Sequence, residues 1–158
     1  MAYKILDWCI GCTACTKRCP TEAISGQRNK LHVIDPNKCI DCGACGVVCP
    51  VECIADEEGD ICKGFPRREW PRAYVIEENC IGSGCEQCIN ICPFEALYLD
   101  TSGERVSDFF GVATVIERRC TGCRLCEDVC NWGAIFVDPP REALKKKLYE
   151  VVEVPPRR

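Results

Sequence analysis

Cysteines recur in four runs of similar spacing, and this repeat constrains the fold more than any other feature of the chain. Sixteen of the 18 cysteines belong to these runs. The first two runs follow the pattern C-x2-C-x2-C-x3-C-P, the third has two additional residues after its first cysteine, and the fourth ends on Asn131 instead of proline. The four runs are Cys9, Cys12, Cys15 and Cys19; Cys39, Cys42, Cys45 and Cys49; Cys80, Cys85, Cys88 and Cys92; and Cys120, Cys123, Cys126 and Cys130.

This spacing suits a metal cluster that is held by thiolates. Gaps of two residues make a tight loop that points three sulfurs inward, whereas the fourth cysteine is aimed away and ligates the other cluster of a pair. Soft thiolates select iron–sulfur clusters or zinc over hard cations. Zinc ribbons use separated C-x2-C pairs that make one site of four ligands, unlike these runs of four. The runs therefore predict cysteine-ligated [4Fe-4S] clusters.

The overall composition is also compatible with a disulfide scaffold, because 18 cysteines in 158 residues is an unusually high content. Disulfide frameworks belong to small secreted proteins, however, and residues 1–8 contain no apolar run typical of a secretion signal. No stretch approaches the roughly 20 apolar residues of a membrane span. A formal charge of −4 and a pI near 5.2 disfavour nucleic-acid partners. We therefore expect a cytoplasmic protein without membrane insertion.

Each cysteine run lies inside an internal repeat. An apolar segment that ends in an acidic residue precedes every run, at 5–7, 33–35, 75–77 and 115–117. A short tail of similar composition follows every run, at 21–24, 51–54, 94–97 and 132–135. Each unit is thus predicted to form a strand, a cluster loop, a short helix and a second strand.

With these motifs the chain resembles bacterial two-cluster ferredoxins, whose fold pairs two such units about a pseudo-twofold axis. The resemblance covers most of residues 1–138 and implies an α+β fold with four [4Fe-4S] clusters. Two tandem dicluster ferredoxin-like units are expected, with small antiparallel hairpins and short helices wrapped around the clusters. The expected boundaries are 1–60 for the first unit, 61–72 for a linker or docking loop, 73–138 for the second unit and 139–158 for a C-terminal helix and tail.

The resemblance leaves two ways to pair the runs. Nested pairing, of run one with run four and run two with run three, is similar to the four-cluster subunits of molybdopterin oxidoreductases. We favour the pairing of neighbours, because the gap between runs one and two is short and because those subunits usually carry longer insertions between their second and third cysteines. Neighbour pairing gives the ligand sets Cys9, Cys12, Cys15 and Cys49; Cys39, Cys42, Cys45 and Cys19; Cys80, Cys85, Cys88 and Cys130; and Cys120, Cys123, Cys126 and Cys92.

Two cysteines and the single histidine lie outside the runs. Cys53 is interpreted as a small buried packing residue, because free cysteine behaves as a small hydrophobe. Cys62 has no counterpart in the repeat and is interpreted as a free thiol in a connecting segment. His32 lies in a predicted strand and is interpreted as an ordinary polar position. The positions equivalent to Cys53 in the other three repeats are occupied by Ala23, Ala96 and Ala134.

The segments that depart from the repeat allow more than one interpretation. Residues 56–72 open acidic and then become basic and aromatic, with Pro66 and Pro71 making a long helix or a central strand unfavourable. This segment is either a solvated linker or a docking loop with aromatic and arginine anchors. The tail predicts a helix over 141–152, with Leu144 and Leu148 on one stripe. That helix either caps its own domain or contacts a larger subunit.

Three arginines lie near the fourth run, and positive charge stabilises the reduced, more negative state of a cluster. The cluster of that run is therefore predicted to have the highest potential of the four. The residues concerned are Arg118, Arg119 and Arg124.

The sequence contains no motif that would bind and transform a substrate. It has no Ser–His–acid set, no glycine-rich phosphate loop and no dinucleotide fingerprint. We therefore expect one-electron transfer without a catalytic site of the chain's own. The chain resembles the small iron–sulfur subunits of tungsten- or molybdenum-pterin oxidoreductases, such as that of the class II benzoyl-CoA reductase complex. This resemblance implies a relay between a redox donor and a larger catalytic subunit; the alternative is a free-standing polyferredoxin.

Overall fold

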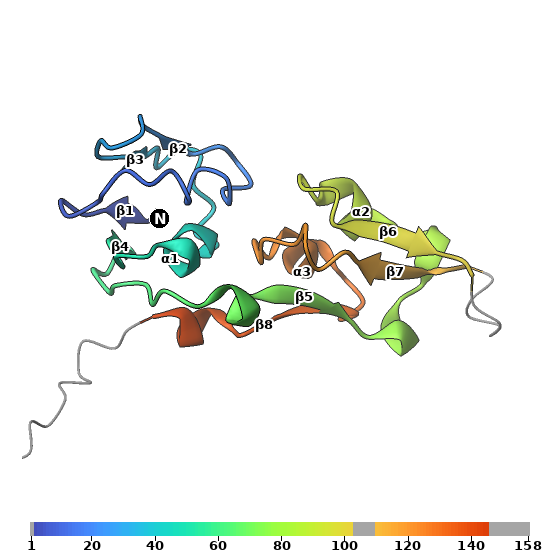
Figure 1. Cartoon of the computed structure of the whole chain (residues 1–158). Coiled ribbons are helices and arrows are strands. Elements are labelled where there is room, and N and C mark those ends of the chain that lie inside the picture. Colours follow the sequence, from blue (N-terminus) through green and yellow to red (C-terminus); the bar gives the residue numbers. More distant parts are fainter. Residues whose placement is uncertain (1, 103–109, 146–158) are drawn as a thin grey trace, which may run out of the picture.

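A computed structural model describes residues 2–102 and 110–145 of the chain, which form two halves built from short elements (Figure 1). The strands are β1 (Lys4–Ile5), β2 (Ile24–Ser25), β3 (Val33–Ile34), β4 (Ile54–Ala55), β5 (Arg72–Val75), β6 (Leu97–Asp100), β7 (Val112–Val115) and β8 (Ile135–Asp138). The α-helices are α1 (Ala44–Val48), α2 (Gln87–Ile91) and α3 (Leu125–Val129). Single 3-10 turns cover Arg67–Glu69, Glu77–Asn79, Gly82–Gly84 and Arg141–Leu144.

The strands form two-stranded antiparallel sheets with the same nested order in both halves. In the first half β1 pairs with β4 and β2 pairs with β3, and in the second half β5 pairs with β8 and β6 pairs with β7. The outer strands of each half are the first and last of that half, so their pairing brings the end of one cysteine repeat beside the start of the other. The α+β architecture of small antiparallel sheets and short helices that the sequence predicts is thereby confirmed.

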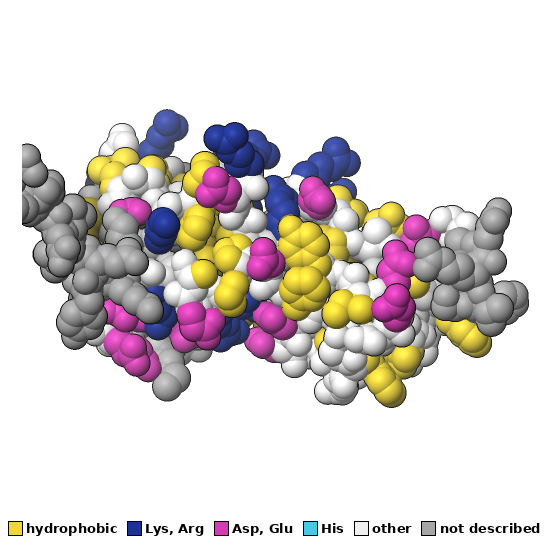
Figure 2. Space-filling model, turned by 90° about the horizontal axis from the view of Figure 1, so that it is seen from below, with side chains coloured by type: hydrophobic (Ala, Val, Ile, Leu, Met, Phe, Trp, Pro, Cys, Tyr) yellow, Lys and Arg dark blue, Asp and Glu magenta, His cyan; other side chains and the backbone are white. Residues whose placement is uncertain are grey.

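An aromatic pair lies across the sheet of β5 and β8. Tyr74 and Phe136 are directly opposite each other in the antiparallel register, and their rings stack with centroids 5.6 Å apart. Cross-strand aromatic pairs stabilise a two-stranded sheet beyond its backbone hydrogen bonds. Figure 2 views this side of the molecule, where apolar side chains lie among acidic ones.

The three α-helices occupy the same place in three cysteine runs. Each begins two residues after the second cysteine of its run, carries the third cysteine, and ends immediately before the fourth. A residue of left-handed backbone precedes each helix, with φ of 76° at Gly43, 53° at Glu86 and 67° at Arg124. In the first run a hydrogen-bonded turn over 14–18 takes the place of the helix. None of the helices among the described residues is long and apolar enough to cross a membrane.

The segment that follows β8 returns to the first half of the molecule (Figure 1). We call residues 141–145 the terminal strap. The backbone N–H of Lys63 donates a 2.8 Å hydrogen bond to the carbonyl oxygen of Leu144, and Lys145 pairs with Cys62 in an isolated antiparallel bridge. The Lys145 ammonium also lies 2.5 Å from the carboxylate of Asp56. The strap thus packs on the first half.

Over the described residues 141–145, the structure has a 3-10 turn at Arg141–Leu144 and an extended Lys145 in place of the predicted α-helix. A helix could not continue here, because the bridge between Lys145 and Cys62 requires extended backbone. Residues 146–158 of the predicted helix and tail lie outside the described residues.

Leu144→Ala is expected to destabilise the protein through the strap. The Leu144 side chain is 1% exposed, and replacing a buried leucine by alanine costs about 2 to 5 kcal/mol. The temperature at which half of the cluster absorbance is lost, measured without air, should fall by about 5 °C or more. Leu31→Ala is the matched control, because Leu31 is 48% exposed and its truncation should leave this temperature nearly unchanged. Equal shifts in the two variants would contradict the role of the strap.

Candidate metal centres

The sixteen cysteines of the runs line four separate cavities. Each cavity takes three cysteines from one run and the fourth cysteine of the neighbouring run in the same half. Centre 1 is lined by Cys9, Cys12, Cys15 and Cys49; centre 2 by Cys39, Cys42, Cys45 and Cys19; centre 3 by Cys80, Cys85, Cys88 and Cys130; and centre 4 by Cys120, Cys123, Cys126 and Cys92. These are the groups that neighbour pairing expects, whereas ligation by each sulfur stays a prediction.

The backbone around the fourth cysteine of each run is built in the same way. The sulfur of this cysteine accepts a hydrogen bond from the N–H four residues later, at 3.2 Å in the first run and 3.4 Å in the others. The residue before each donor has positive φ, which turns the amide back toward the sulfur. Hydrogen bonds to thiolate sulfur stabilise its charge and tune cluster potential. The donors are Ala23, Cys53, Ala96 and Ala134.

The sequence did not predict these amide donors, because every residue except proline has a backbone N–H and no residue type marks the ones that donate. The small side chain at each donor position was the available signal. All four side chains are buried. A larger residue would have to displace the wall of the cavity in order to keep the amide near the sulfur.

Burial makes the thiols of the cavities weak acids on their own. It raises the pKa of Cys15 and of Cys42 to about 11 and that of Cys126 to about 12. Thiolates that are this poorly solvated need positive charge beside them, which coordinated iron supplies. The residues therefore fit a thiolate-ligated metal group, and its binding must release protons.

The two cysteines outside the runs differ in their surroundings. The Cys53 sulfur lies 3.4 Å from the Cys49 sulfur and lines the cavity of centre 1. Cys62 is buried inside the first half, where a Cβ at Gly46 would lie 2.3 Å from the Cys62 Cβ. Burial, followed by the charge of Asp56, raises the pKa of Cys62 to about 12. Cys62 is therefore an inert packing residue in this structure.

His32 corrects one interpretation of the sequence. The histidine is not an ordinary polar position in a strand: it precedes β3, its ring is buried, and it lines the cavity of centre 1. Its Nδ1 donates a 3.0 Å hydrogen bond to the carbonyl oxygen of Lys30, and Nε2 has no partner among the described residues. A Cβ at Gly26 would lie 2.6 Å from the ring, so the missing side chain of that glycine makes room for the histidine.

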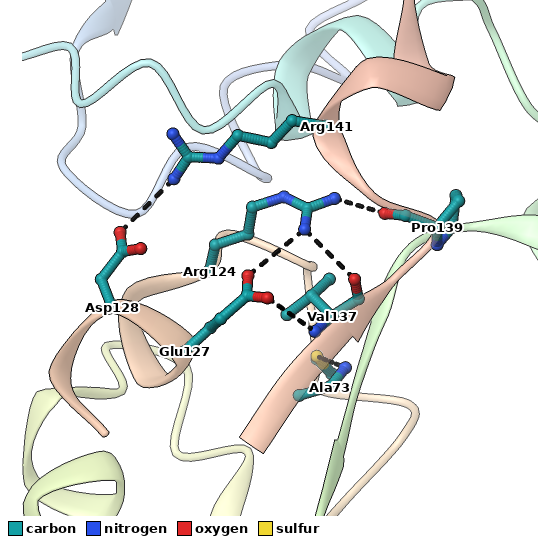
Figure 3. A network of polar contacts seen from close by, with 8 residues as sticks. Ala73, Arg124, Glu127, Asp128, Val137, Pro139 and Arg141 are labelled. Carbon is teal, nitrogen blue, oxygen red and sulfur yellow. Dashed lines mark hydrogen bonds and ion pairs between the residues drawn. The ribbon is translucent and has the colours of Figure 1, made fainter. Parts of the chain in front are cut away.

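Arg124 lines the cavity of centre 4, but its positive charge is paired with another side chain. Figure 3 shows its guanidinium between Glu127, Val137 and Pro139. Arg124 lies 3.3 Å from the Glu127 carboxylate, and it donates to the carbonyl oxygens of Val137, at 3.2 Å, and Pro139. The side chain is buried and its charge is balanced by Glu127. The contribution expected from Arg124 to the potential of centre 4 is thereby reduced.

The two halves meet through cysteines of different centres. Cys42 of centre 2, Ala44 and Cys123 of centre 4 form one buried cluster, against which Phe94 and Leu125 pack. Burial, followed by the charge of Cys123, raises the pKa of Cys42. Centres 2 and 4 therefore adjoin at the boundary of the halves.

Comparison with protein families gives matches in both halves. One 4Fe-4S dicluster domain model matches residues 5–55, and a second 4Fe-4S dicluster domain model matches residues 38–96 and 79–134. A ferredoxin of Clostridium sp. (strain M-E) is 56% identical over 37 residues, which are 23% of this chain and 66% of that protein. A ferredoxin of Clostridium pasteurianum is 57% identical over 35 residues, which are 22% of this chain and 61% of that protein.

The chain thus spans less than two thirds of the length of these relatives. Among solved structures, a chain of the formate dehydrogenase – heterodisulfide reductase – formylmethanofuran dehydrogenase complex from Methanospirillum hungatei is 23% identical. The similarity covers 82% of this chain and 52% of that chain. The TM-score is 0.37, which is too low to support an inference about partners. The second dicluster model alone extends over more than half of the sequence. The chain therefore belongs to the 4Fe-4S dicluster domain family, and its two dicluster domains imply four [4Fe-4S] clusters.

Proposed function

We propose that this chain is the electron-transfer subunit of an oxidoreductase and relays single electrons between a redox donor and a larger catalytic subunit. The observation that carries this proposal is the contact of Cys42 with Cys123, which links the metal centres of the two halves. Bound [4Fe-4S] clusters supply the one-electron chemistry, and the chain's own residues space the clusters and exclude water from them.

The proposed ligands are the four cysteines of the runs that line each cavity. Three come from one loop and the fourth from the neighbouring repeat, so each cluster would tie together two segments of the same half. Support comes from the shared lining of each cavity and from the amide hydrogen bond to every fourth sulfur. The two remaining cysteines, Cys53 and Cys62, are proposed not to ligate.

The contacts suggest the order in which electrons would pass. Centres 1 and 2 exchange their fourth cysteines, as do centres 3 and 4. Centres 2 and 4 adjoin through Cys42 and Cys123. The proposed path therefore runs through centres 1, 2, 4 and 3, with centres 1 and 3 at the ends.

Exposed apolar side chains lie at both ends of this path. Ile10 lines the cavity of centre 1 and is 54% exposed, and Trp132 lines the cavity of centre 3 and is 53% exposed. Exposed aromatic and aliphatic side chains are typical of contact surfaces for protein partners. Two such ends support a relay between two partners, and the resemblance to small iron–sulfur subunits favours a tungsten- or molybdenum-pterin protein as one of them. Thiolate-held clusters also need a reducing compartment, which supports a cytoplasmic location.

Native mass spectrometry of the complex from its source, purified without air, tests this proposal. We expect a fixed ratio of this chain to a larger subunit, together with about 16 iron ions per chain, four for each cluster. A fixed ratio to a protein that contains tungsten or molybdenum would support the pterin partner. Isolation of the iron-loaded chain alone, reducing several unrelated acceptors equally well, would instead favour a free-standing polyferredoxin.

A further inference from the structure

Arg18 belongs to the first cysteine run, but its guanidinium lies against the second half of the molecule. Its Nη2 donates a 3.0 Å hydrogen bond to the carbonyl oxygen of Thr121, which lies between two cysteines of centre 4. The guanidinium carbon is 4.3 Å from the centre of the Trp70 ring, within the range of a cation–π contact. Arg18 is thus held from two sides at the boundary between the halves.

The positive charge of Arg18 lies close to the loop that carries Cys120 and Cys123 of centre 4. Burial lowers the pKa of Arg18, and the leading opposing influences are the negative charges of Cys120 and Cys123. Arginine nevertheless stays protonated at neutral pH, because the reference pKa of its guanidinium lies far above 7. The positive charges of Arg72 and Arg67 also lower the Arg18 pKa. The guanidinium Nε is also buried and has no hydrogen-bond partner among the described residues.

Arg18 and Arg124 differ in how their charges are balanced. Arg124 lies beside the Glu127 carboxylate and directs its donors to the end of β8. Arg18, in contrast, donates to the backbone carbonyl of Thr121 and lies over the Trp70 ring. Arg18 is therefore a partly buried cation whose contacts place its charge beside the cysteine loop of centre 4.

We propose that Arg18 is a positioning residue that raises the reduction potential of centre 4 from across the boundary of the halves. Reduction makes a cluster more negative, so a fixed positive charge beside it favours the reduced state. Because the first half supplies this charge, electron transfer from centre 2 to centre 4 is favoured only while the two halves are docked. The inference rests on the proposed function only in requiring a cluster in centre 4.

Arg18→Gln tests the inference, because glutamine retains a hydrogen-bond donor but carries no charge. Lys17→Gln is the matched control, since it removes the same charge from the neighbouring exposed residue. The midpoint potentials of the clusters would be measured by anaerobic redox titration followed by electron paramagnetic resonance. Contact-shifted proton resonances of Cys120 and Cys123 would identify centre 4. We expect Arg18→Gln to lower the midpoint of centre 4, Lys17→Gln to leave it nearly unchanged, and Arg18→Lys to restore part of the shift.

An unchanged midpoint of centre 4 in Arg18→Gln would overturn the inference, as would an equal shift in Lys17→Gln. If Arg18→Gln fails to retain its iron, Trp70→Leu provides the second test. It removes the ring that covers the guanidinium, admits water to the charge, and should lower the same midpoint by a smaller amount. No shift in Trp70→Leu would then count against the inference. Failure to find a catalytic partner would contradict the proposed function. It would not affect the expected difference in the midpoint potential of centre 4 between Arg18→Gln and Lys17→Gln.

Discussion

Removal of iron from the anaerobically purified protein should unfold it and abolish its dispersed amide spectrum. The reason is that the polypeptide has little independent stability. Its α-helices are five residues long, far below the roughly 12 to 15 residues at which an isolated helix becomes marginal. Its sheets have two strands each, and an isolated two-stranded sheet is marginal at best.

The composition of the core leads to the same expectation. Three of the buried residues in the main cluster of the first half, Cys15, Cys45 and Cys49, are proposed ligands, so removing the metal removes what this core is packed around. Structural zinc supplies about 10 to 16 kcal/mol in small metal-dependent domains, comparable with the whole stability of an ordinary protein, about 5 to 15 kcal/mol. Thiolate bonds to four iron clusters should therefore decide whether this chain folds.

Two-dimensional amide spectra and far-ultraviolet circular dichroism, recorded before and after chelation under reducing conditions, would measure the unfolding. The control is reconstitution of the same sample with iron and sulfide, which should restore both signals. A well-dispersed spectrum from protein that has lost its iron completely would show that the polypeptide packs without the clusters and would contradict the prediction.

Cys42→Ala should remove the cluster of centre 2 and lower the iron content from about 16 to about 12 ions per chain or fewer. Cys42 lines the cavity of centre 2 and is buried at the contact with Cys123. Alanine provides no ligand atom, so three thiolates would remain for that cluster. Iron and acid-labile sulfide, determined on protein purified without air, would measure the loss.

Cys53→Ala is the matched control for this substitution. Cys53 is buried and its sulfur lies 3.4 Å from that of Cys49, but alanine occupies the equivalent position in the other three repeats. The backbone N–H at this position, which donates to the Cys49 sulfur, is retained in the variant. Iron should stay at about 16 ions per chain. Loss of about four ions from Cys53→Ala with none from Cys42→Ala would mean that the ligands of the first half are assigned wrongly.

The sequence predicted best what depends on a few consecutive residues. The cysteine runs predicted the family and its cofactor, because the loop that wraps a cluster is a local structure and its ligands must recur at fixed spacing. The helices after the second cysteine and the small residues at the donor positions follow from the same loop. The expected helix of the tail was wrong over 141–145, because packing on the first half decided that conformation.

The surroundings of single side chains could not be predicted in this way. The periodicity around His32 gave no signal of a buried ring, since its burial depends on the missing side chain of Gly26. Arg124 directly follows the second cysteine of its run in sequence, which suggested a charge beside the cluster. In the structure its backbone is left-handed, with φ of 67°, and its side chain pairs with Glu127. Arg18 gave no signal either, because Thr121, which accepts its hydrogen bond, is 103 residues away.

The sequence by itself thus determined the cofactor, the repeat and the class of fold, because ligand spacing and strand patterns are properties of short segments. Only the tertiary structure decided which cysteine loops share a cavity, that Cys42 meets Cys123 at the boundary, and that Arg18 lies beside the second half. These contacts join residues far apart in the chain. They depend on how two halves with similar local sequences pack together, and no local pattern specifies that packing.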